Sequence, residues 1–472
     1  MSRRIPFGAP IATAAQMRAA EQAVMDGGVS VDELMERAGL AIAREVRRFA
    51  ANRRILIAAG PGNNGGDAYV AARHLAAWGL QVAVSAHGRA GEGAAARMAA
   101  RWTGRTVALD AADPRPLFVD GLFGTGTSRP LDTTTASLIS RLQGAAELTI
   151  AIDLPSGIFA DGTGVGNGVS ADLTIALGAL KIAHVVGPEA VRCGHVMLAD
   201  IGVPVCTSVT TIAPPSLAPL TGEVQKFSRG MVAVVGGAMP GASLLAASAA
   251  MRGGAGYVML TERQPSGVSP HALVRRTLPD ADALASLLDD HRIGAVVIGP
   301  GLARDTEARA LLDATLASRR DLIVDADALS LLGRDVGQRI GTARRTVFLT
   351  PHGGEFDRLF GADGGNKIDR TLAAAAASGA IVIHKGSDTV IATPDGQAVV
   401  MASATPWLST AGTGDVLAGL VASRHAHLKD RPLQAASEAV WLHAAAAALA
   451  TPPFIADDVV ARLPDALAAA TL

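Results

Sequence analysis

Short apolar runs alternate with helical segments along most of the chain, and this alternation limits the possible folds more than any other feature. Residues 54–60, for example, form an apolar run that ends in glycine, and residues 68–78 follow with helical spacing. Runs without a polar face are typical of strands that are buried on both sides of a sheet. The pattern therefore predicts parallel sheets wrapped by helices, which is an α/β fold.

Two series of such runs are separated by a stretch rich in proline, serine and threonine. The first also includes residues 81–86, 117–122, 148–154 and 173–177, and the second includes residues 231–235, 257–260, 295–298, 322–325, 347–349, 380–383 and 389–392. A chain of 472 residues exceeds one ordinary core. We expect two doubly wound domains at residues 1–205 and 223–472, the first a Rossmann-like three-layer sandwich, joined by a linker at residues 206–222.

The composition excludes several classes of protein. A formal charge of -1 and an aromatic content of 3% argue against a nucleic-acid-binding surface. The two cysteines, Cys193 and Cys206, are too few for a disulfide framework, and this number fits a reducing compartment. The longest apolar run, at residues 439–450, is shorter than the roughly 20 residues of a membrane span. We expect a soluble cytoplasmic protein without nucleic-acid or membrane partners.

Polar residues follow three strands of the first domain, at residues 62–67, 120–130 and 153–157. Open parallel sheets bind ligands at the carboxyl ends of their strands, so these segments are expected to lie together. The amide and carboxylate oxygens can hold a polar ring, a phosphate and a cation with oxygen ligands. Each segment alone is more typical of a tight turn. The presence of all three favours a binding site.

These motifs, read as Gly62-Asn-Asn-Gly-Gly-Asp67, Asp120-x-Leu-Phe-Gly-Thr-Gly126 and Ile152-Asp-Leu-Pro-Ser-Gly157, resemble the NAD(P)H-hydrate epimerase domain. The resemblance implies interconversion of the R and S epimers of hydrated NADH and NADPH, whose C6 carbon carries a hydroxyl. Epimerisation at such a carbinolamine-type carbon requires proton transfer, and Asp153 is the acid–base candidate. The resemblance also implies a potassium ion held by Asn64, Asp120 and Ser156. The implied substrate contacts are Asn63, Asn64, Gly65, Gly66, Asp67, Gly124, Thr125, Gly126, Thr127, Ser128, Arg129, Pro130 and Asp153.

In the second domain the strongest local signal is the segment at residues 409–419. Gly412 and Gly414 leave backbone amides uncovered where a helix is predicted to begin, which is typical of a phosphate site. Asp415 is unfavourable beside a phosphate unless it holds a cation or accepts a proton from a hydroxyl. The alternative is that Asp415 caps its own helix.

Further polar residues follow other strands of this domain. Asp325 and Asp327 are compatible with magnesium or with substrate hydroxyls, although Asp327 can equally cap the next helix. His352 either faces a ligand or is a buried structural histidine. Lys385 and the small residues after it suit a nucleotide phosphate or ribose.

The motifs Thr350-Pro-His-x-Gly-Glu355, Lys385-Gly-x-Asp388 and Gly412-Thr-Gly-Asp-Val-Leu-Ala-Gly419 resemble the NAD(P)H-hydrate dehydratase branch of the ribokinase-like fold. The resemblance implies that the S hydrate is phosphorylated by ADP, with Mg²⁺, and then loses phosphate. Asp415 is implied as the base. The implied hydrate contacts are Ala242, Gly301, His352 and Asp415, and the implied nucleotide contacts are Lys385, Gly386, Ser387, Asp388, Thr389 and Gly414.

The leading hypothesis is a bifunctional enzyme that repairs hydrated NADH and NADPH. The alternative is a small-molecule kinase, such as one for a vitamin precursor, with an accessory non-catalytic nucleotide-binding domain. Because α/β enzymes of this type often assemble, we also expect a homo-oligomer.

Overall fold

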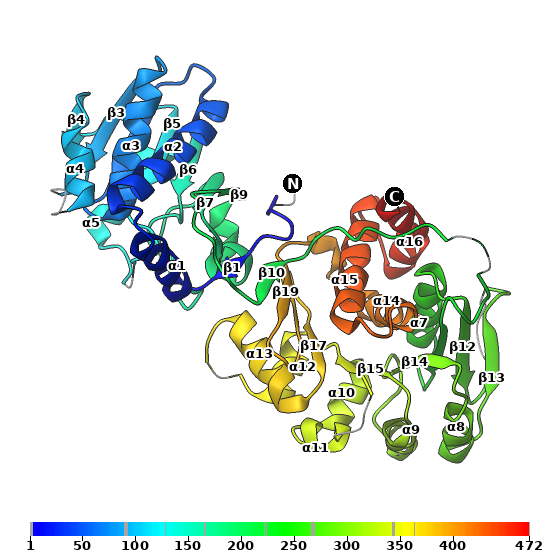
Figure 1. Ribbon diagram of the computed structural model, residues 1–472. Coiled ribbons are helices and arrows are strands. Elements are labelled where there is room, and N and C mark those ends of the chain that lie inside the picture. Colours follow the sequence, from blue (N-terminus) through cyan, green and yellow to red (C-terminus); the bar gives the residue numbers. More distant parts are fainter. Residues whose placement is uncertain are drawn as a thin grey trace. The chain divides into compact units, whose positions relative to one another are not determined.

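The computed structural model describes residues 3–88, 93–127, 129–164, 167–220, 222, 224–265, 270–341, 345–362 and 364–471. The chain divides into two compact units, Met1–Thr211 and Ile212–Leu472. Each unit is an α/β structure (Figure 1). The predicted α/β class is confirmed.

The first unit contains one main sheet and the helices around it. Its elements are β1 (Ile11–Ala12), α1 (Ala14–Asp26), α2 (Val31–Ala50), β2 (Ile55–Ala59), α3 (Asn63–Ala77), β3 (Val82–Ala86), α4 (Ala94–Ala100), β4 (Thr106–Ala108), β5 (Leu117–Gly121), α5 (Thr133–Gly144), β6 (Leu148–Ile152), β7 (Leu173–Leu177), β8 (Leu180–Lys181), α6 (Ile182–Val185), the 3-10 helix η1 (Pro188–Cys193), β9 (His195–Ala199) and β10 (Val209–Thr211).

The main sheet of the first unit is parallel, with strand order β4-β3-β2-β5-β6-β7-β9. Successive residues of β2 point to opposite faces, as the pleat requires. Ile55 and Ile57 pack in the cluster formed with α2 and α3, whereas Leu56 packs in the cluster formed with α5. Both faces are therefore buried, which explains why the strand sequences are apolar throughout.

The second unit is larger. Its elements are β11 (Met231–Val235), α7 (Pro240–Arg252), β12 (Tyr257–Glu262), β13 (Val274–Thr277), α8 (Ala281–Leu288), β14 (Ile293–Ile298), α9 (Thr306–Ala317), β15 (Leu322–Val324), α10 (Ala326–Leu332), α11 (Val336–Ile340), β16 (Val347–Leu349), α12 (Gly353–Phe360), α13 (Lys367–Ser378), β17 (Ile381–His384), β18 (Thr389–Ala392), β19 (Ala398–Met401), the 3-10 helix η2 (Pro406–Leu408), α14 (Thr413–His427), α15 (Pro432–Leu449) and α16 (Ala456–Ala470).

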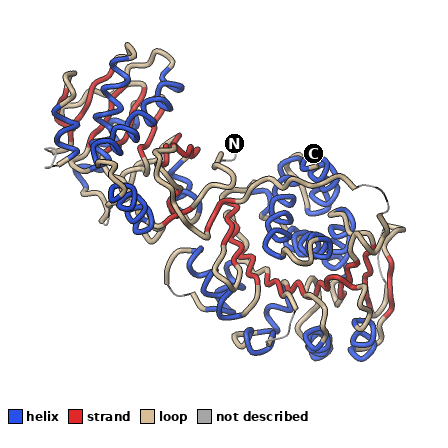
Figure 2. Tube along the Cα trace, in the orientation of Figure 1, coloured by secondary structure: helices blue, strands red, loops and turns tan. Residues whose placement is uncertain are grey.

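The sheet of the second unit is mixed. Strands β17-β16-β15-β14-β11-β12-β13 run parallel, and β18 and β19 extend the β17 side in antiparallel orientation. Figure 2 shows the strands as a band with helices on both faces. Helices α7, α14, α15 and α16 pack together on one face, and their alanine-rich surfaces allow close approach. The predicted ribokinase-like arrangement is confirmed.

Within the described residues, no helix combines the length and the apolar character that crossing a membrane requires.

Candidate active sites

A cavity of about 1100 Å³ opens in the first unit at the carboxyl ends of β2, β5 and β6. Ten of the predicted substrate contacts line it: Asn63, Asn64, Asp67, Gly124, Thr125, Gly126, Thr127, Arg129, Pro130 and Asp153. Predicted Ser128 lies outside the described residues. The three motifs therefore meet at one place, as expected because parallel sheets bind ligands at the carboxyl ends of their strands.

Gly65 and Gly66 are absent from the described lining of this cavity and pack inside the unit instead. A Cβ atom on Gly65 would lie 1.9 Å from the Gly60 carbonyl oxygen, and one on Gly66 would lie 2.4 Å from Met35 Sδ. The glycines thus allow α3 to begin directly against the sheet. Residues Gly62, Asn63 and Asn64 at the amino end of this 15-residue helix line the cavity, and the start of a helix favours an anionic or polar ligand.

Asp153 is held on the cavity wall by an ion pair. It follows β6 in the left-handed region, with φ of 61°, and its Oδ1 accepts from Lys181 Nζ at 2.5 Å. The ammonium group also donates to the carbonyl oxygens of Leu177 and Ala179, so each of its three hydrogens has an acceptor. His184 Nε2 lies 2.7 Å from the Asp153 carbonyl oxygen. These contacts fix both the backbone and the carboxylate of Asp153.

Two further acids, Asp67 and Glu21, line the same cavity. Burial, followed by the charges of Asp153 and Glu21, raises the pKa of Asp67 well above its usual value. Burial and the charge of Asp153 also raise the pKa of Glu21, while Lys181 and Arg18 oppose this change. The cavity therefore contains carboxyl groups in different electrostatic environments.

Asp120 and Ser156 form a buried pair under the loop that follows β5. Asp120 Oδ1 accepts from Ser156 Oγ at 2.6 Å, and Oδ2 accepts from the Ser156 amide at 2.7 Å. Burial raises the pKa of Asp120. The Asn64 side chain lies close to Gly124 in the same loop, and its buried Nδ2 lacks a hydrogen-bond partner in the described structure. The three predicted potassium ligands thus all border residues 121–124.

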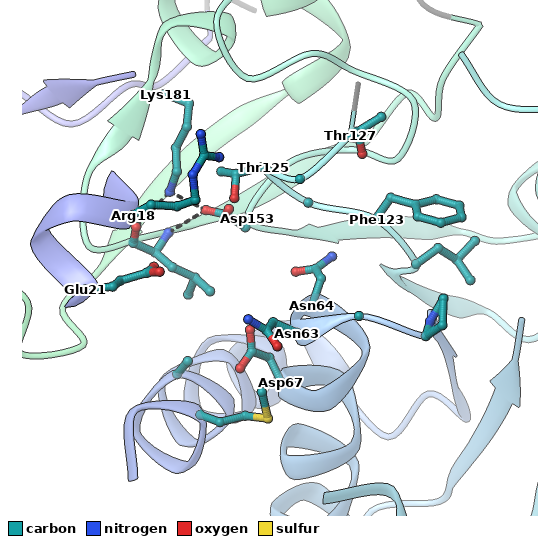
Figure 3. A pocket seen from close by; sticks show the side chains of 18 of the residues that line it. Arg18, Glu21, Asn63, Asn64, Asp67, Phe123, Thr125, Thr127, Asp153 and Lys181 are labelled. Carbon is teal, nitrogen blue, oxygen red and sulfur yellow. Dashed lines mark hydrogen bonds and ion pairs between the residues drawn. The ribbon is translucent and has the colours of Figure 1, made fainter. Parts of the chain in front are cut away.

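The charged residues of this cavity that sequence reasoning missed include Arg18, Glu21 and Lys181. Figure 3 shows that Arg18 and Glu21 reach it from α1, and Lys181 from the segment after β7. Lys181 carried a usable signal, because it is the one charged residue in the apolar segment 173–186. The other two lie on an amphipathic helix and cannot be distinguished from solvent-facing residues by pattern alone.

The second site is built at the start of α14. Gly412 has φ of 89°, and the first turn of the helix follows with Gly414 and Asp415. A Cβ atom on Gly414 would lie 3.1 Å from Lys385 Nζ and 3.8 Å from Asp325 Oδ2. Lys385 Nζ donates to Asp325 Oδ1 at 2.8 Å. Gly414 of the glycine turn, Lys385 and the buried Asp325 therefore lie close together.

Asp415 faces this group. Burial, followed by the neighbouring charge of Asp325, raises the pKa of Asp415 to about 7, against the lowering effect of Lys385. Among the described residues, no backbone amide of α14 donates to this carboxylate. Asp415 is therefore not the cap of its helix, and its proton affinity suits a general base near neutral pH.

The other predicted contacts border the same edge of the sheet. A Cβ atom on Gly301 would lie 3.1 Å from the Ala242 Cβ, so these two positions are adjacent. The backbone of His352 pairs with that of Lys385 in an isolated β-bridge. Because 57% of its side chain is exposed, His352 is not a buried structural histidine. Asp327 accepts from the Ala303 amide and from Arg304, so it fastens the neighbouring loop and does not cap α10.

Lys367 was missed by sequence reasoning, although it anchors the predicted nucleotide loop. Its Nζ donates to Asp388 Oδ1 at 2.7 Å, to the Asp388 carbonyl oxygen and to the Lys385 carbonyl oxygen at 3.3 Å. The ammonium lies next to Gly386, whose Cβ, if present, would be 2.7 Å away. Residues 385–388 are thus fixed around the partly buried ammonium of Lys367.

The fold and the two sites define a two-domain α/β enzyme. The chain matches a family model described as NAD(P)H-hydrate dehydratase over residues 232–467 and one described as YjeF-related protein N-terminus over residues 31–183. It is 32% identical to a bifunctional NAD(P)H-hydrate repair enzyme, Nnr, of Thermofilum pendens, covering 84% of this chain and 83% of that relative. The Thermosynechococcus vestitus enzyme of the same description is 33% identical, with 93% and 92% covered.

A solved structure described as an ADP/ATP-dependent NAD(P)H-hydrate dehydratase from Bacillus subtilis, co-crystallised with ATP and Mg²⁺, is 26% identical. The match covers 54% of the present chain and 95% of the Bacillus subtilis chain, with a TM-score of 0.47. The chain belongs to the family of bifunctional NAD(P)H-hydrate repair enzymes, which combine an epimerase and a dehydratase.

Proposed function

We propose that the cavity of the first unit is the epimerase site and that the start of α14 is an ADP-dependent dehydratase site. The observation that carries the second assignment is the position of Asp415, which has a pKa of about 7 and faces Asp325, Lys385 and the Gly412–Gly414 turn. A base with this proton affinity is well suited to a substrate hydroxyl at neutral pH.

In the dehydratase reaction, Asp415 accepts the proton of the C6 hydroxyl. The hydroxyl oxygen then attacks the terminal phosphoryl group of ADP, and the bond from this phosphoryl group to AMP breaks. The amide groups of the Gly412–Gly414 turn stabilise the transferring charge. Phosphate subsequently leaves C6, a proton leaves C5 and the ring double bond returns. Phosphorylation is needed because hydroxide is a poor leaving group.

Ala242, Gly301 and His352 are proposed to contact the hydrate, and Lys385 to Thr389 together with Gly414 are proposed to hold the AMP portion. The ammonium of Lys385 is already fixed by Asp325, so it is preorganised for a phosphate oxygen. The donor set also fits Mg²⁺ bound with ADP, because Mg²⁺ commonly uses one or two carboxylates together with substrate phosphates. Asp325 is the carboxylate that would hold it, and the ion would balance phosphate charge.

The residues around Asp120 fit a potassium ion. Asp120 is fully buried and has no basic partner among the described residues, so it needs either a proton or a bound cation. Asn64, Asp120 and Ser156 provide oxygen ligands of the kind that hard cations prefer. We propose that these residues hold potassium and that the ion fixes the loop at residues 122–124 against α3.

The assay supplies the purified full-length chain with a mixture of R and S hydrates, ADP and Mg²⁺. Reduced nicotinamide absorbance should return completely, because the epimerase converts R into S as S is consumed. Recovery of only the S fraction would contradict the epimerase assignment. ATP-dependent formation of a stable phosphorylated alcohol without cofactor recovery would support the kinase alternative.

The proposal includes a cytoplasmic location and a homo-oligomer. Light scattering of the purified chain tests the second statement, and a monomeric mass would contradict it.

A further inference from the structure

Asp67 and Asp153 face the first-unit cavity from opposite sides. Figure 3 shows Asp153 beside Lys181 on one side and Asp67 beside Asn63 on the other. Asp67 projects from α3, whereas Asp153 follows β6, so the two side chains are positioned by different elements. Both are largely buried, with 9% and 7% of their surfaces exposed.

The two carboxyl groups differ in their partners. Asp153 is paired with the Lys181 ammonium at 2.5 Å. Asp67 has no ion-pair partner among the described residues, and the nearby charges of Asp153 and Glu21 are of the same sign. Burial and these charges raise the pKa of Asp67 well above its usual value. One side of the cavity therefore presents a carboxylate paired with a cation and the other a carboxyl group without a cationic partner among the described residues, and such a contrast in environment is typical of acid–base pairs.

Inversion at C6 needs both functions. The hydroxyl can leave from one face only as water, which requires a proton donor, because hydroxide is a poor leaving group. A new water molecule can then attack the other face, and it must lose a proton. A donor and an acceptor on opposite sides of the ring match this requirement.

We propose that Asp67 is a second catalytic residue of the epimerase and acts opposite Asp153. Asp67 donates its proton to the C6 hydroxyl as the C6–O bond breaks, and the N1 lone pair forms an N1=C6 iminium. A water molecule attacks the opposite face, its proton passes to Asp153, and the electron pair returns to N1. One water leaves and one enters, and a proton moves from Asp67 to Asp153. The reverse direction restores the pair, as does proton exchange with water in the cavity.

This inference rests on the proposed function of the cavity, and the experiment separates the two. The purified 472-residue chain is incubated with the pure R hydrate in ¹⁸O-labelled water without ADP. The two epimers are then separated, and the mass of each is measured by mass spectrometry. We expect one ¹⁸O atom in each inverted molecule, above a blank without enzyme. In deuterium oxide, C6 should gain no deuterium, because the C6–H bond does not break.

Asp67→Asn is expected to lower kcat for epimerisation about 100-fold or more, with KM changed less than about threefold. ADP-driven dehydration of the S hydrate by the same molecules should remain normal, and the β7 amides should keep wild-type protection from hydrogen exchange, which shows that the first unit is folded. Asp113→Asn removes an exposed acid outside the described cavity lining and should leave both activities unchanged. Should Asp67→Asn unfold the first unit, Asp67→Ser gives the same comparison.

A wild-type kcat in Asp67→Asn, or a change confined to KM, would overturn the catalytic role of Asp67 while leaving the cavity as the epimerase site. Retention of the original oxygen in the inverted product would overturn the exchange of water between faces. A wild-type chain that cannot epimerise at all would overturn the proposed function of the cavity and this inference together.

Discussion

The Lys181 ammonium lies 2.5 Å from Asp153 Oδ1, with only 1% of the lysine side chain exposed. The pair joins the end of β6 to the segment after β7, and the Leu177 amide adds a second contact to the same carboxylate oxygen at 3.1 Å. The charge that holds Asp153 is therefore largely buried, and salt screens it much less than a surface pair.

We expect Lys181→Met to destabilise the first unit by about 3–5 kcal/mol, because it leaves a buried carboxylate without its partner. Epimerisation should fall with it. Hydrogen exchange of the β7 amides measures the change in this unit separately from the second. The double variant Lys181→Met/Asp153→Asn should be less destabilised than Lys181→Met, since neither charge remains. Equal protection in the single variant and the wild type would show that the ion pair is energetically unimportant.

Asp415→Asn should lower dehydration by about 10²–10⁴-fold and leave epimerisation unchanged, because the variant cannot accept the hydroxyl proton. In the wild type, the dehydration rate should rise with pH through about 7, where Asp415 becomes ionised, and level off above it. Initial rates at saturating ADP and S hydrate measure both effects. Loss of both activities in a folded variant would contradict the assignment of the two sites.

Ionisation of Asp415 should raise the dehydration rate but lower the stability of the folded chain. Asp415 loses its proton near pH 3.8 when unfolded and near 7 when folded, so ionisation lowers the free energy of unfolding as pH rises between these values. Asp415→Asn should therefore be more stable than the wild type at pH 8, with a difference that shrinks toward pH 4. Urea unfolding of the ligand-free chain at both values tests this, and exposed Asp430→Asn is the charge-matched control.

Lys367→Met should raise the KM for ADP about tenfold or more, since the loop at residues 385–388 loses three hydrogen bonds to its anchoring ammonium. Epimerisation should not change. Steady-state kinetics with varied ADP measure the effect, and Arg309→Met removes an exposed cation from α9 as a control. An unaltered KM would mean that the loop keeps its conformation without Lys367.

Replacement of potassium by choline should slow epimerisation and lower the melting temperature of the first unit, because a ligand that binds only the folded state stabilises it. Asp120→Asn should abolish both responses to potassium. The melting temperature provides a readout that does not depend on turnover. A potassium response that persists in this variant would place the ion elsewhere.

Much of the fold was predictable because interior strands are apolar on both faces. The predicted runs at residues 117–122 and 231–235, for example, correspond to β5 and β11. Seven strands of the described residues were missed, β1, β4, β8, β9, β10, β13 and β19, and all but β19 have a single neighbour in their sheet. Strands at sheet edges are short or partly exposed, as β4 and β13 are, and so their apolar signal is weak.

The site residues were easiest to predict where one short segment contains all the structural elements that position them. Residues 62–67 and 409–415 contain both the turn and the helix start, so a local pattern was sufficient. Lys181 and Lys367 act through partners 28 and 21 residues away, and their roles depend on which strands lie next to each other. That information arises only when the chain folds.

At several glycines the backbone packs directly against another stretch of backbone, and Gly60, Gly65 and Gly419 are three examples. A Cβ atom on Gly60 would lie 1.8 Å from the Leu122 carbonyl oxygen, one on Gly65 would lie 1.9 Å from that of Gly60, and one on Gly419 would lie 2.0 Å from that of Ala246. No substitution can be absorbed there by moving a flexible side chain. Directed evolution toward other damaged cofactors must therefore leave these glycines alone and draw its diversity from positions such as Gly126, where an added Cβ atom would meet nothing within 4 Å.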